Sequence, residues 1–392
     1  MNNLEIYIHI PFCIKKCSYC DFLSFPASDD EKERYVSALC AEIKNAKAQY
    51  GDFNITTVYM GGGTPSVLSC SQIGKIGSAL HDTFDLSGLK GKKKNFIRKK
   101  EIPPRIEFTF EANPKTLDKE KLKAFKDMGA NRVSLGLQSA DNNELKELGR
   151  IHTYEDFLDT FWLAREEGFD NINTDIMQAV PRQNIYSYRK TLANVMALRP
   201  EHISAYSLII EEGTPFYERM NGPSPLALPD EDEEREIYYE TGDVLGRAGY
   251  AQYEISNYAL AGKQCRHNIG YWRRENYLGL GLGASSMVDN VRWKNTPDMK
   301  KYLEGTDIKE EIQKLSVKEQ MEEYMFLGLR LADGISKEKF FESFKTDFDF
   351  IYGAKVYELA ADGLIESDGD MVRLTKRGVD VSNRVFAEFL LD

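Results

Sequence analysis

The first 208 residues alternate short runs of β-branched and aromatic side chains with longer segments of helical period. This alternation is typical of repeated βαβ units, in which the strands lie parallel in one sheet. Six units are too few to close an eight-stranded barrel, so the sequence predicts an α/β fold with an incomplete (β/α)6 TIM-like barrel. The expected strands are residues 5–10, 57–60, 105–111, 133–138, 171–177 and 203–208, and the expected helices are residues 31–50, 71–84, 118–128, 154–168 and 185–198.

The rest of the chain predicts two further parts. Residues 224–312 begin with a proline-containing linker and an acidic helix, and continue into a glycine- and aromatic-rich segment without a clear helical or strand period. Residues 313–392 contain three amphipathic helical runs, a hairpin at residues 364–374 and a final apolar helix. This order resembles a winged-helix unit, so we expect a smaller C-terminal α+β domain after a barrel domain at residues 1–223.

The charge of the chain argues against nucleic acid as a partner. A formal net charge of −11 repels phosphate backbones. Winged-helix units often bind DNA, but the acidic C-terminal part favours a structural or protein-contact role. A basic stretch at residues 88–104 is expected to be a solvated loop. With no apolar tract long enough to span a bilayer and no leader sequence, the expected location is the cytoplasm.

Polar residues gather where the expected strands end, at residues 61–64, 111–113 and 138–139 and at Asp175. Ligands of parallel α/β sheets bind beyond the carboxyl ends of the strands. The sequence therefore predicts one site shared by all of these segments.

Three cysteines, Cys13, Cys17 and Cys20, form a CxxxCxxC motif on the loop after the first expected strand. Six cysteines in all are too few for a disulfide scaffold in a chain of this size, and clustered thiols in a reducing compartment favour a metal site. A four-iron cluster held by three thiolates leaves one iron open to an exogenous ligand. The alternative is a tetrahedral zinc site with His9 as the fourth ligand. The spacing, without a second cysteine pair elsewhere, favours the cluster.

Further motifs accompany the CxxxCxYC loop. They are GGGTPS at residues 61–66, FEANP at 110–114, NRVSLGLQS at 131–139, then EISNYA, CRHNIGYW and the C-terminal GLIESDGDMVRLTKRGVDVSNRVF. In this order, and over nearly the whole chain, they resemble the oxygen-independent coproporphyrinogen III oxidase family of radical S-adenosylmethionine proteins. The resemblance implies a barrel of the radical S-adenosylmethionine type with a [4Fe–4S] cluster on the three cysteines and S-adenosylmethionine as a second cofactor.

The resemblance also implies which residues contact the cofactors. Glycines suit such contacts because they let the backbone approach a ligand closely, and carboxylates accept hydrogen bonds from amino and hydroxyl groups. The implied contacts are Gly62, Gly63 and Thr64 to the methionine portion, Glu111 and Asp175 to the amino group or ribose hydroxyls, Gln138 and Arg150 on the adenosine side, and Tyr7 and Tyr19 next to the cluster.

Two departures from the family pattern matter. The oxidase branch has a further cysteine two residues beyond the cluster motif, where this chain has Phe22. That difference points to the branch of haem chaperones. In addition, residues 177–183 read MQAVPRQ where the family has a YGLPGQ-like turn. Because both glycines are lost, we expect the geometry of this loop to differ from that of the family.

The chaperone branch also carries an HNxxYW motif, present here at residues 267–272. A neutral imidazole is a common axial ligand of haem iron, so His267 is a predicted haem contact, while Tyr271 and Trp272 offer flat faces to a macrocycle. Cys265 is an alternative ligand. The structural alternative is that His267 forms hydrogen bonds inside a packed segment.

The expected function is that of a haem chaperone, which binds a [4Fe–4S] cluster, S-adenosylmethionine and haem and delivers haem to acceptor apoproteins, with a separate reductant for the cluster. One alternative is a true oxidase that decarboxylates the propionates of coproporphyrinogen III. Such an enzyme needs convergent arginines for a tetra-anionic substrate, and the sequence identifies no such set. A third alternative is a zinc-stabilised binding module. Without the extra cysteine, the resemblance leaves enzymatic activity open.

Overall fold

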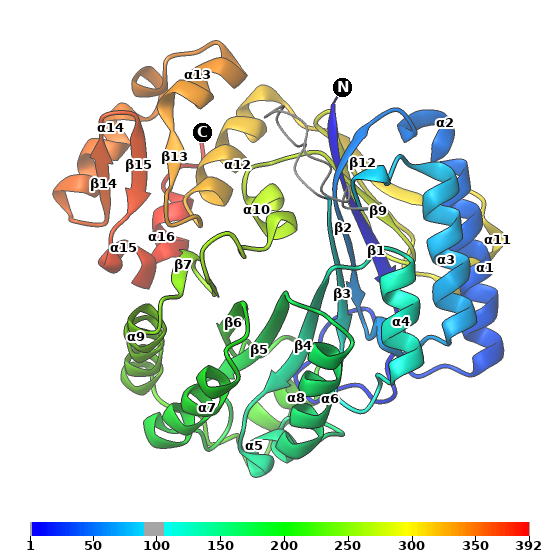
Figure 1. Ribbon diagram of the computed structural model, residues 1–392. Coiled ribbons are helices and arrows are strands. Elements are labelled where there is room, and N and C mark those ends of the chain that lie inside the picture. Colours follow the sequence, from blue (N-terminus) through cyan, green and yellow to red (C-terminus); the bar gives the residue numbers. More distant parts are fainter. Residues whose placement is uncertain (1, 90–105, 392) are drawn as a thin grey trace, which may run out of the picture.

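The computed structural model describes residues 2–89 and 106–391. Most of the basic stretch predicted as a loop lies outside these ranges, at residues 90–104. The six predicted parallel strands are confirmed, and they pair in chain order to form the incomplete barrel (Figure 1). They are β1 (Asn3–Ile10), β2 (Asn54–Gly62), β3 (Glu107–Ala112), β4 (Arg132–Gln138), β5 (Ile172–Gln178) and β6 (His202–Ser207).

The helices of the barrel lie where the apolar periodicity predicts them. Ser28, Ser69 and Thr153 each form a capping box at a helix start. The expected helix at residues 31–50 is divided in two at Ala46, and α5 was not predicted because six residues show too little periodicity. The helices are α1 (Asp29–Asn45), α2 (Lys47–Tyr50), α3 (Cys70–Thr83), α4 (Lys119–Asp127), α5 (Asn142–Glu147), α6 (Tyr154–Glu166) and α7 (Ile185–Leu198).

The segment that showed no clear period extends the sheet at both edges. Antiparallel strands β7 (Ala251–Glu254) and β8 (Asn257–Ala259) follow β6, and β9 (Tyr277–Leu280) pairs in parallel with β1. Beyond β9 lie β10 (Ser285–Val288), β11 (Val291–Asn295) and β12 (Lys309–Lys314), which complete a sheet of 12 strands in the order β12-β11-β10-β9-β1-β2-β3-β4-β5-β6-β8-β7. The helices of this part are α8 (Pro215–Met220), α9 (Glu231–Arg247), α10 (Arg266–Trp272) and α11 (Met299–Glu304).

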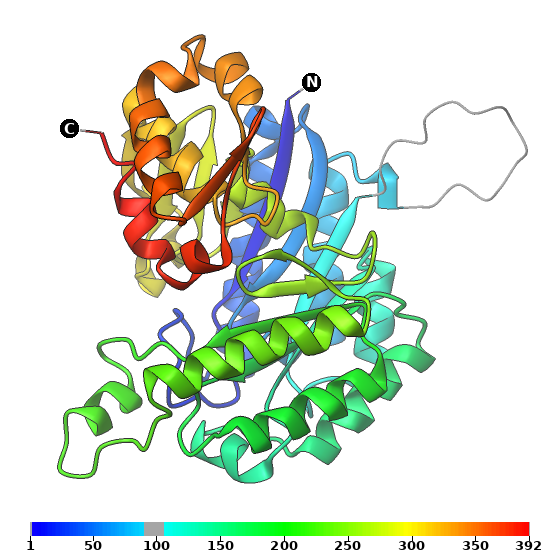
Figure 2. The ribbon, with the colours of Figure 1, turned by 90° about the vertical axis from the view of Figure 1, so that its left-hand side faces the viewer.

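The C-terminal unit has its own core and the expected winged-helix order. The predicted hairpin is present as β14 (Ile365–Asp368) and β15 (Met371–Leu374), and β13 (Ile335–Ser336) pairs with β15. The helices are α12 (Val317–Gly328), α13 (Lys337–Phe344), α14 (Phe348–Ala361), α15 (Lys376–Asp380) and α16 (Ser382–Ala387). Figure 2 views the molecule from the side of this unit, which is drawn in orange and red. None of the helices in the described part of the chain has the length and apolar character needed to cross a bilayer.

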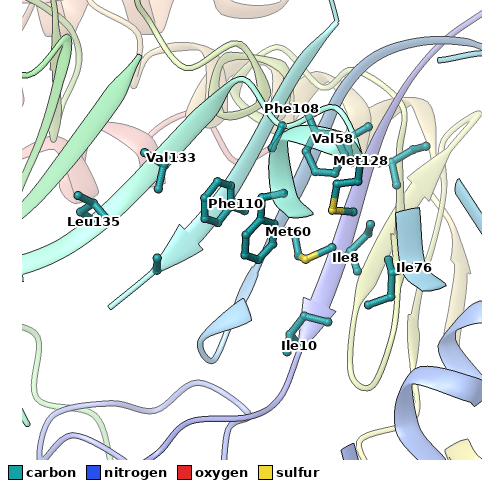
Figure 3. Packing of buried hydrophobic residues seen from close by; sticks show 14 of the residues in the cluster. Ile8, Ile10, Val58, Met60, Ile76, Phe108, Phe110, Met128, Val133 and Leu135 are labelled. Carbon is teal, nitrogen blue, oxygen red and sulfur yellow. The ribbon is translucent and has the colours of Figure 1, made fainter. Parts of the chain in front are cut away.

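Strand alternation gives the sheet an apolar face and a polar face. Successive side chains point to opposite faces, so Ile8 and Ile10 of β1 lie on the helix-covered side together with the apolar residues of β2 and β3. Figure 3 shows these strand residues gathered near Ile76 of α3 and Met128 after α4. The other face, inside the curve of the sheet, carries the polar residues between them, and α10 lies on this side, where it contacts β2 and α12 (Figure 1).

Candidate cluster and cofactor site

A cavity of about 320 Å³ lies at the carboxyl ends of the barrel strands, and we call it the barrel cavity. It brings together most of the predicted site residues, namely Cys13, Cys17, Tyr19, Cys20, Gly62, Gly63, Glu111, Gln138, Arg150 and Asp175. Thr64 lies just outside, with its hydroxyl 3.3 Å from the Cys13 thiol. Tyr7 and His267 do not line the barrel cavity.

The cysteine loop is held in place by backbone hydrogen bonds. The Cys13 N–H donates to the Phe25 carbonyl at 3.1 Å, and the Ser18 N–H donates to the Leu148 carbonyl at 3.0 Å. Burial raises the pKa of the Cys13 and Cys20 thiols. Because iron binds thiolates, cluster binding must displace these protons, which couples cluster assembly to the local fold.

The zinc alternative would require His9 to give up a hydrogen bond. In residues 2–89 and 106–391, no three histidine, cysteine or carboxylate side chains converge closely enough to hold one metal ion. A cubane cluster binds its thiolates through different irons, so its ligands surround a space instead of one point. The proposed fourth zinc ligand, His9, holds both ring nitrogens in hydrogen bonds, with Tyr7 Oη at 3.0 Å and the Leu23 carbonyl at 2.9 Å.

The glycine segment at the end of β2, Gly61–Gly63, is packed so closely that only glycine fits. Gly62 has a φ of +103°, and a Cβ there would lie 2.3 Å from the His9 ring. A Cβ on Gly61 would lie 2.8 Å from the Glu111 carboxylate, and one on Gly63 would lie 2.7 Å from the Phe12 carbonyl oxygen. Glycine is thus required by close packing against His9, Glu111 and Phe12, and Gly62 and Gly63 also line the barrel cavity.

Two half-buried carboxylates face the barrel cavity from β3 and β5. Glu111 accepts hydrogen bonds from the Tyr59 hydroxyl at 2.8 Å and from the Gly62 N–H at 3.1 Å. Asp175 accepts from the Asn173 amide at 2.6 Å and from the Ser134 hydroxyl at 3.2 Å. Burial raises the pKa of both carboxyl groups, that of Glu111 to about 7.

Arg150 connects the cluster loop to β4. Its Nη1 lies 3.5 Å from the Cys17 sulfur, and its Nη2 donates to the Gly136 carbonyl at 2.7 Å and to the Asn113 side chain. Gln138, at the end of β4, adopts a left-handed φ of 72° and accepts a hydrogen bond from the Tyr206 hydroxyl at 3.0 Å. Both side chains are thus fixed at the wall of the cavity.

Sequence reasoning did not single out several cavity residues. Tyr59, Arg132 and Ser134 line the barrel cavity from the inner face of the sheet. Strand alternation was the signal that could have found them, because Tyr59 lies two residues before Gly61 and Ser134 lies four before Gln138.

The loop at residues 177–183 keeps the conformation that glycines would adopt. Ala179 has a φ of 55° and Arg182 a φ of 67°, and these are the two positions at which the family pattern has glycine. The departure in sequence therefore places two side chains in the left-handed region.

His267 is buried inside the curve of the sheet. Its Nδ1 lies 2.7 Å from the Thr57 hydroxyl and its Nε2 lies 2.9 Å from the Tyr271 hydroxyl. Burial lowers its pKa to about 3, so the ring is neutral. Its role as a haem ligand stays a prediction, and ligation would require the ring to give up one of these bonds. The Cys265 thiol is also buried and lies 3.6 Å from the Glu107 carboxylate.

A second cavity, of about 430 Å³, lies beyond β1 toward the β9–β11 edge of the sheet, and we call it the edge cavity. Tyr7 and His9 line it from β1, and Tyr271 and Trp272 line it from α10. Tyr7 therefore faces this second space, not the cysteine loop.

Comparison with known proteins agrees with this geometry. The chain matches the Radical SAM superfamily over residues 7–195 and the HemN C-terminal domain over residues 315–381. It is 36% identical to the heme chaperone HemW of Lactococcus lactis over 98% of this chain and 97% of that protein. It is 30% identical to the heme chaperone HemW of Escherichia coli K12 over 99% of this chain and 98% of that protein.

A solved structure gives the same fold. The chain superposes on the radical SAM enzyme coproporphyrinogen III oxidase (HemN) of Escherichia coli with a TM-score of 0.84, over 99% of this chain and 90% of that one, at 21% identity. At this identity the likeness supports the fold alone, whereas the relatives above match in sequence from end to end. The chain therefore belongs to the radical SAM family of proteins named heme chaperone HemW.

Proposed function

We propose that this protein binds a [4Fe–4S] cluster, S-adenosylmethionine and haem, and that it passes haem to acceptor apoproteins. The observation that carries the proposal is the barrel cavity, where three cysteine thiols, the Gly62–Gly63 backbone and two half-buried carboxylates face one space. Membership in a family whose curated members are named heme chaperones adds haem as the cargo.

In the proposed site each group has a separate task. Cys13, Cys17 and Cys20 hold the cluster, which when bound offers an open iron to S-adenosylmethionine and supplies one electron. The Gly62–Gly63 backbone and the Glu111 carboxylate receive the methionine portion, since a carboxylate accepts hydrogen bonds from an amino group. Asp175, Gln138 and Arg150 receive the adenosine portion, and Tyr19 lies beside the cluster loop.

The oxidase alternative has less support. A tetra-anionic porphyrinogen calls for several converging arginines, and two line the barrel cavity, Arg132 and Arg150. Arg150 already bonds to Asn113 and to the Gly136 carbonyl. Phe22, at the position of the oxidase cysteine, is 63% exposed and supplies no ligand.

The partners and the place of action belong to the same proposal. Six cysteines without a disulfide suit a reducing compartment, which supports a cytoplasmic location, and a cluster held by Cys13, Cys17 and Cys20 would need a separate electron donor. The acceptors are proteins that bind haem and lack it before contact with this protein.

Anaerobic reconstitution tests the cluster. The expected result is about four irons and four sulfides per chain in the wild type, and loss of the cluster absorption in Cys13→Ser, Cys17→Ser and Cys20→Ser. The matched control is Cys70→Ser, because Cys70 is exposed and does not line the barrel cavity. Zinc in place of iron would favour the binding-module alternative.

A transfer assay tests the chaperone function. The protein loaded with ferric haem is mixed with an apoglobin, and the globin haem spectrum is followed in time. The expected result is stoichiometric haem uptake followed by transfer. Decarboxylation of coproporphyrinogen III without haem uptake would contradict the proposal and favour the oxidase.

A further inference from the structure

The loop that carries the three cysteines also presents four exposed side chains that the proposed site does not use. Ile14 is 56% exposed and Phe22 is 63% exposed, and Lys15 and Lys16 are exposed as well. Lys15, Lys16 and Phe22 line the barrel cavity together with the cysteines. Because these three side chains are both exposed and part of the cavity wall, they lie at its mouth. We call Ile14, Lys15, Lys16 and Phe22 the cluster-loop face.

The cluster-loop face is basic on an acidic protein. The chain as a whole has a net charge of −11. Lys16 Nζ donates a hydrogen bond to the Phe22 carbonyl at 3.0 Å, and neither lysine of the face forms an ion pair within residues 2–89 and 106–391. The exposed carboxylates of Asp21, in the same loop, and of Glu211 and Glu212, before α8, do not line the cavity. Two positive charges are therefore available to a partner at the cavity mouth.

The face lies close to the sulfurs in space as well as in sequence. Burial raises the pKa of the Cys20 thiol, and the charge of Lys16 acts in the opposite direction, as a neighbouring cation does. The loop is fixed to the barrel, since the Phe216 N–H donates to the Ser18 carbonyl at 3.0 Å. The rate of electron transfer falls steeply with distance. A carrier that docks on this face would therefore deliver its electron to the cysteine loop over a short path.

The charges indicate what kind of carrier fits. Charge of opposite sign steers two proteins together and orients them, and it acts within a Debye length, about 8 Å at physiological salt. An acidic carrier is repelled by the rest of this surface and attracted at the two lysines, which places it at the cavity mouth. A basic carrier would be attracted to the acidic remainder of the chain, away from the cysteines. Transient redox interfaces are small, so two apolar side chains with a charged rim are a suitable size.

We propose that the cluster-loop face is the docking surface for a small acidic protein that carries one electron at a time. Carboxylates of the carrier pair with Lys15 and Lys16, and its apolar side chains contact Ile14 and Phe22. The carrier is oxidised by one electron and the cluster on the three cysteines is reduced by one electron, and no covalent bond forms or breaks. This inference rests on the proposed cluster function and adds the chemistry and the docking surface of the electron donor.

Binding tests the surface directly. The probes are two acidic carriers, a plant-type [2Fe–2S] ferredoxin and a flavodoxin, each added to the anaerobically reconstituted full-length protein. We expect binding that weakens as salt is raised from about 50 to about 300 mM, and carbodiimide cross-links from Lys15 or Lys16 to carboxylates of the carrier. Lys15→Glu/Lys16→Glu should weaken binding about tenfold at low salt. The matched control is Lys123→Glu/Lys300→Glu, which changes the net charge equally at two exposed lysines outside the cavity.

A second variant tests the apolar part of the face. Phe22→Ala should weaken binding several-fold and leave its salt dependence unchanged, because it removes apolar contact area and no charge. Phe350→Ala is the matched control, since Phe350 is exposed on α14 and does not line the barrel cavity.

Reduction kinetics separate docking from the cluster itself. Stopped-flow absorption follows reduction of the cluster by each reduced carrier. In Lys15→Glu/Lys16→Glu the rate constant at low salt should fall about tenfold. The iron content and the extent of reduction by excess dithionite, which needs no docking surface, should equal those of the wild type.

Three other outcomes would contradict the account. A wild type that binds neither carrier, or a lysine variant that binds them as tightly as the wild type, would overturn the inference and leave the cluster intact. Binding of the wild type to phosphatidylglycerol vesicles instead of the carriers, lost in the lysine variant, would overturn it in favour of a membrane surface. A wild type that forms no cluster would overturn the proposed function itself.

Discussion

The guanidinium of Arg150 lies against the thiol of Cys17, with 3.5 Å between Nη1 and Sγ. The two residues are far apart in sequence, and the contact exists because the helix α5 returns the chain to the cysteine loop after β4. A fixed positive charge at this distance stabilises negative charge on the sulfur. It therefore favours both the thiolate that binds iron and a cluster that has gained an electron.

Removal of this charge should make the cluster harder to reduce. In Arg150→Met we expect the midpoint potential of the reconstituted cluster to fall by a few tens of millivolts, where about 59 mV corresponds to a tenfold change for one electron. A redox titration followed by electron paramagnetic resonance measures it. Arg189→Met is the control, because Arg189 is exposed on α7 and pairs with Glu240. An unchanged or higher potential in Arg150→Met would contradict the electrostatic reading of the contact.

The part of the site that follows directly from short sequence motifs could be predicted. The cysteine motif, the glycine segment and Glu111 each follow an expected strand, and parallel strands bring their carboxyl ends together. Strands β7–β12 were not predicted, because they are short and their pairing depends on contacts between segments far apart in the sequence.

The position of the aromatic motif was also beyond sequence reasoning. The HNxxYW motif predicts that a histidine is present, but it does not predict which groups form hydrogen bonds with the two ring nitrogens. Thr57 lies 210 residues before His267, and its hydroxyl forms the hydrogen bond with Nδ1 of that histidine. Likewise Tyr7 was expected next to the cluster, and alternation does place it on the inner face of β1. The fold then turns it toward the edge cavity.

Binding of S-adenosylmethionine should strengthen as the pH rises through neutrality. Burial raises the pKa of Glu111 to about 7, so its carboxyl is mostly protonated at pH 6 and mostly ionised at pH 7.5. Only the ionised form is a full acceptor for the amino group of the ligand. We expect the dissociation constant, measured by anaerobic equilibrium dialysis, to fall several-fold over this range. Glu111→Gln should bind weakly at every pH, and retention of the wild-type pH dependence would refute the assignment.

Glu5 is expected to reduce stability at neutral pH. Its carboxyl is buried beside His267, with 3.8 Å between Oε2 and Nδ1, and burial raises its pKa to about 9. A raised pKa in the folded state means that its contribution to stability is complete below about pH 4.5 and is lost as the pH rises toward 9.

The neutral isostere should remove this loss. Glu5→Gln is expected to raise the free energy of unfolding by about 2–3 kcal/mol at pH 7 and to change it little at pH 4.5. Urea denaturation at both pH values measures the difference. Glu304→Gln, at an exposed position after the first turn of α11, should have little effect at either pH. A destabilised Glu5→Gln at pH 7 would mean that the ionised carboxylate is needed in the fold.

The loop at residues 177–183 should become more stable when its glycines are restored. Ala179 and Arg182 have φ values of 55° and 67°, and a side chain in the left-handed region costs about 1–2 kcal/mol. Ala179→Gly and Arg182→Gly should each raise the free energy of unfolding by about 0.5–1 kcal/mol, because the strain relieved exceeds the entropy that glycine adds to the unfolded chain. The Arg182 N–H keeps its 2.7 Å hydrogen bond to the Ala227 carbonyl in either case.

Ala354→Gly, on the exposed face of α14, is a control of opposite sign and should cost about 1 kcal/mol. If both loop variants are destabilised like the helix control, residues 179 and 182 do not adopt a left-handed φ in solution. The loop would then differ from the glycine-containing turn.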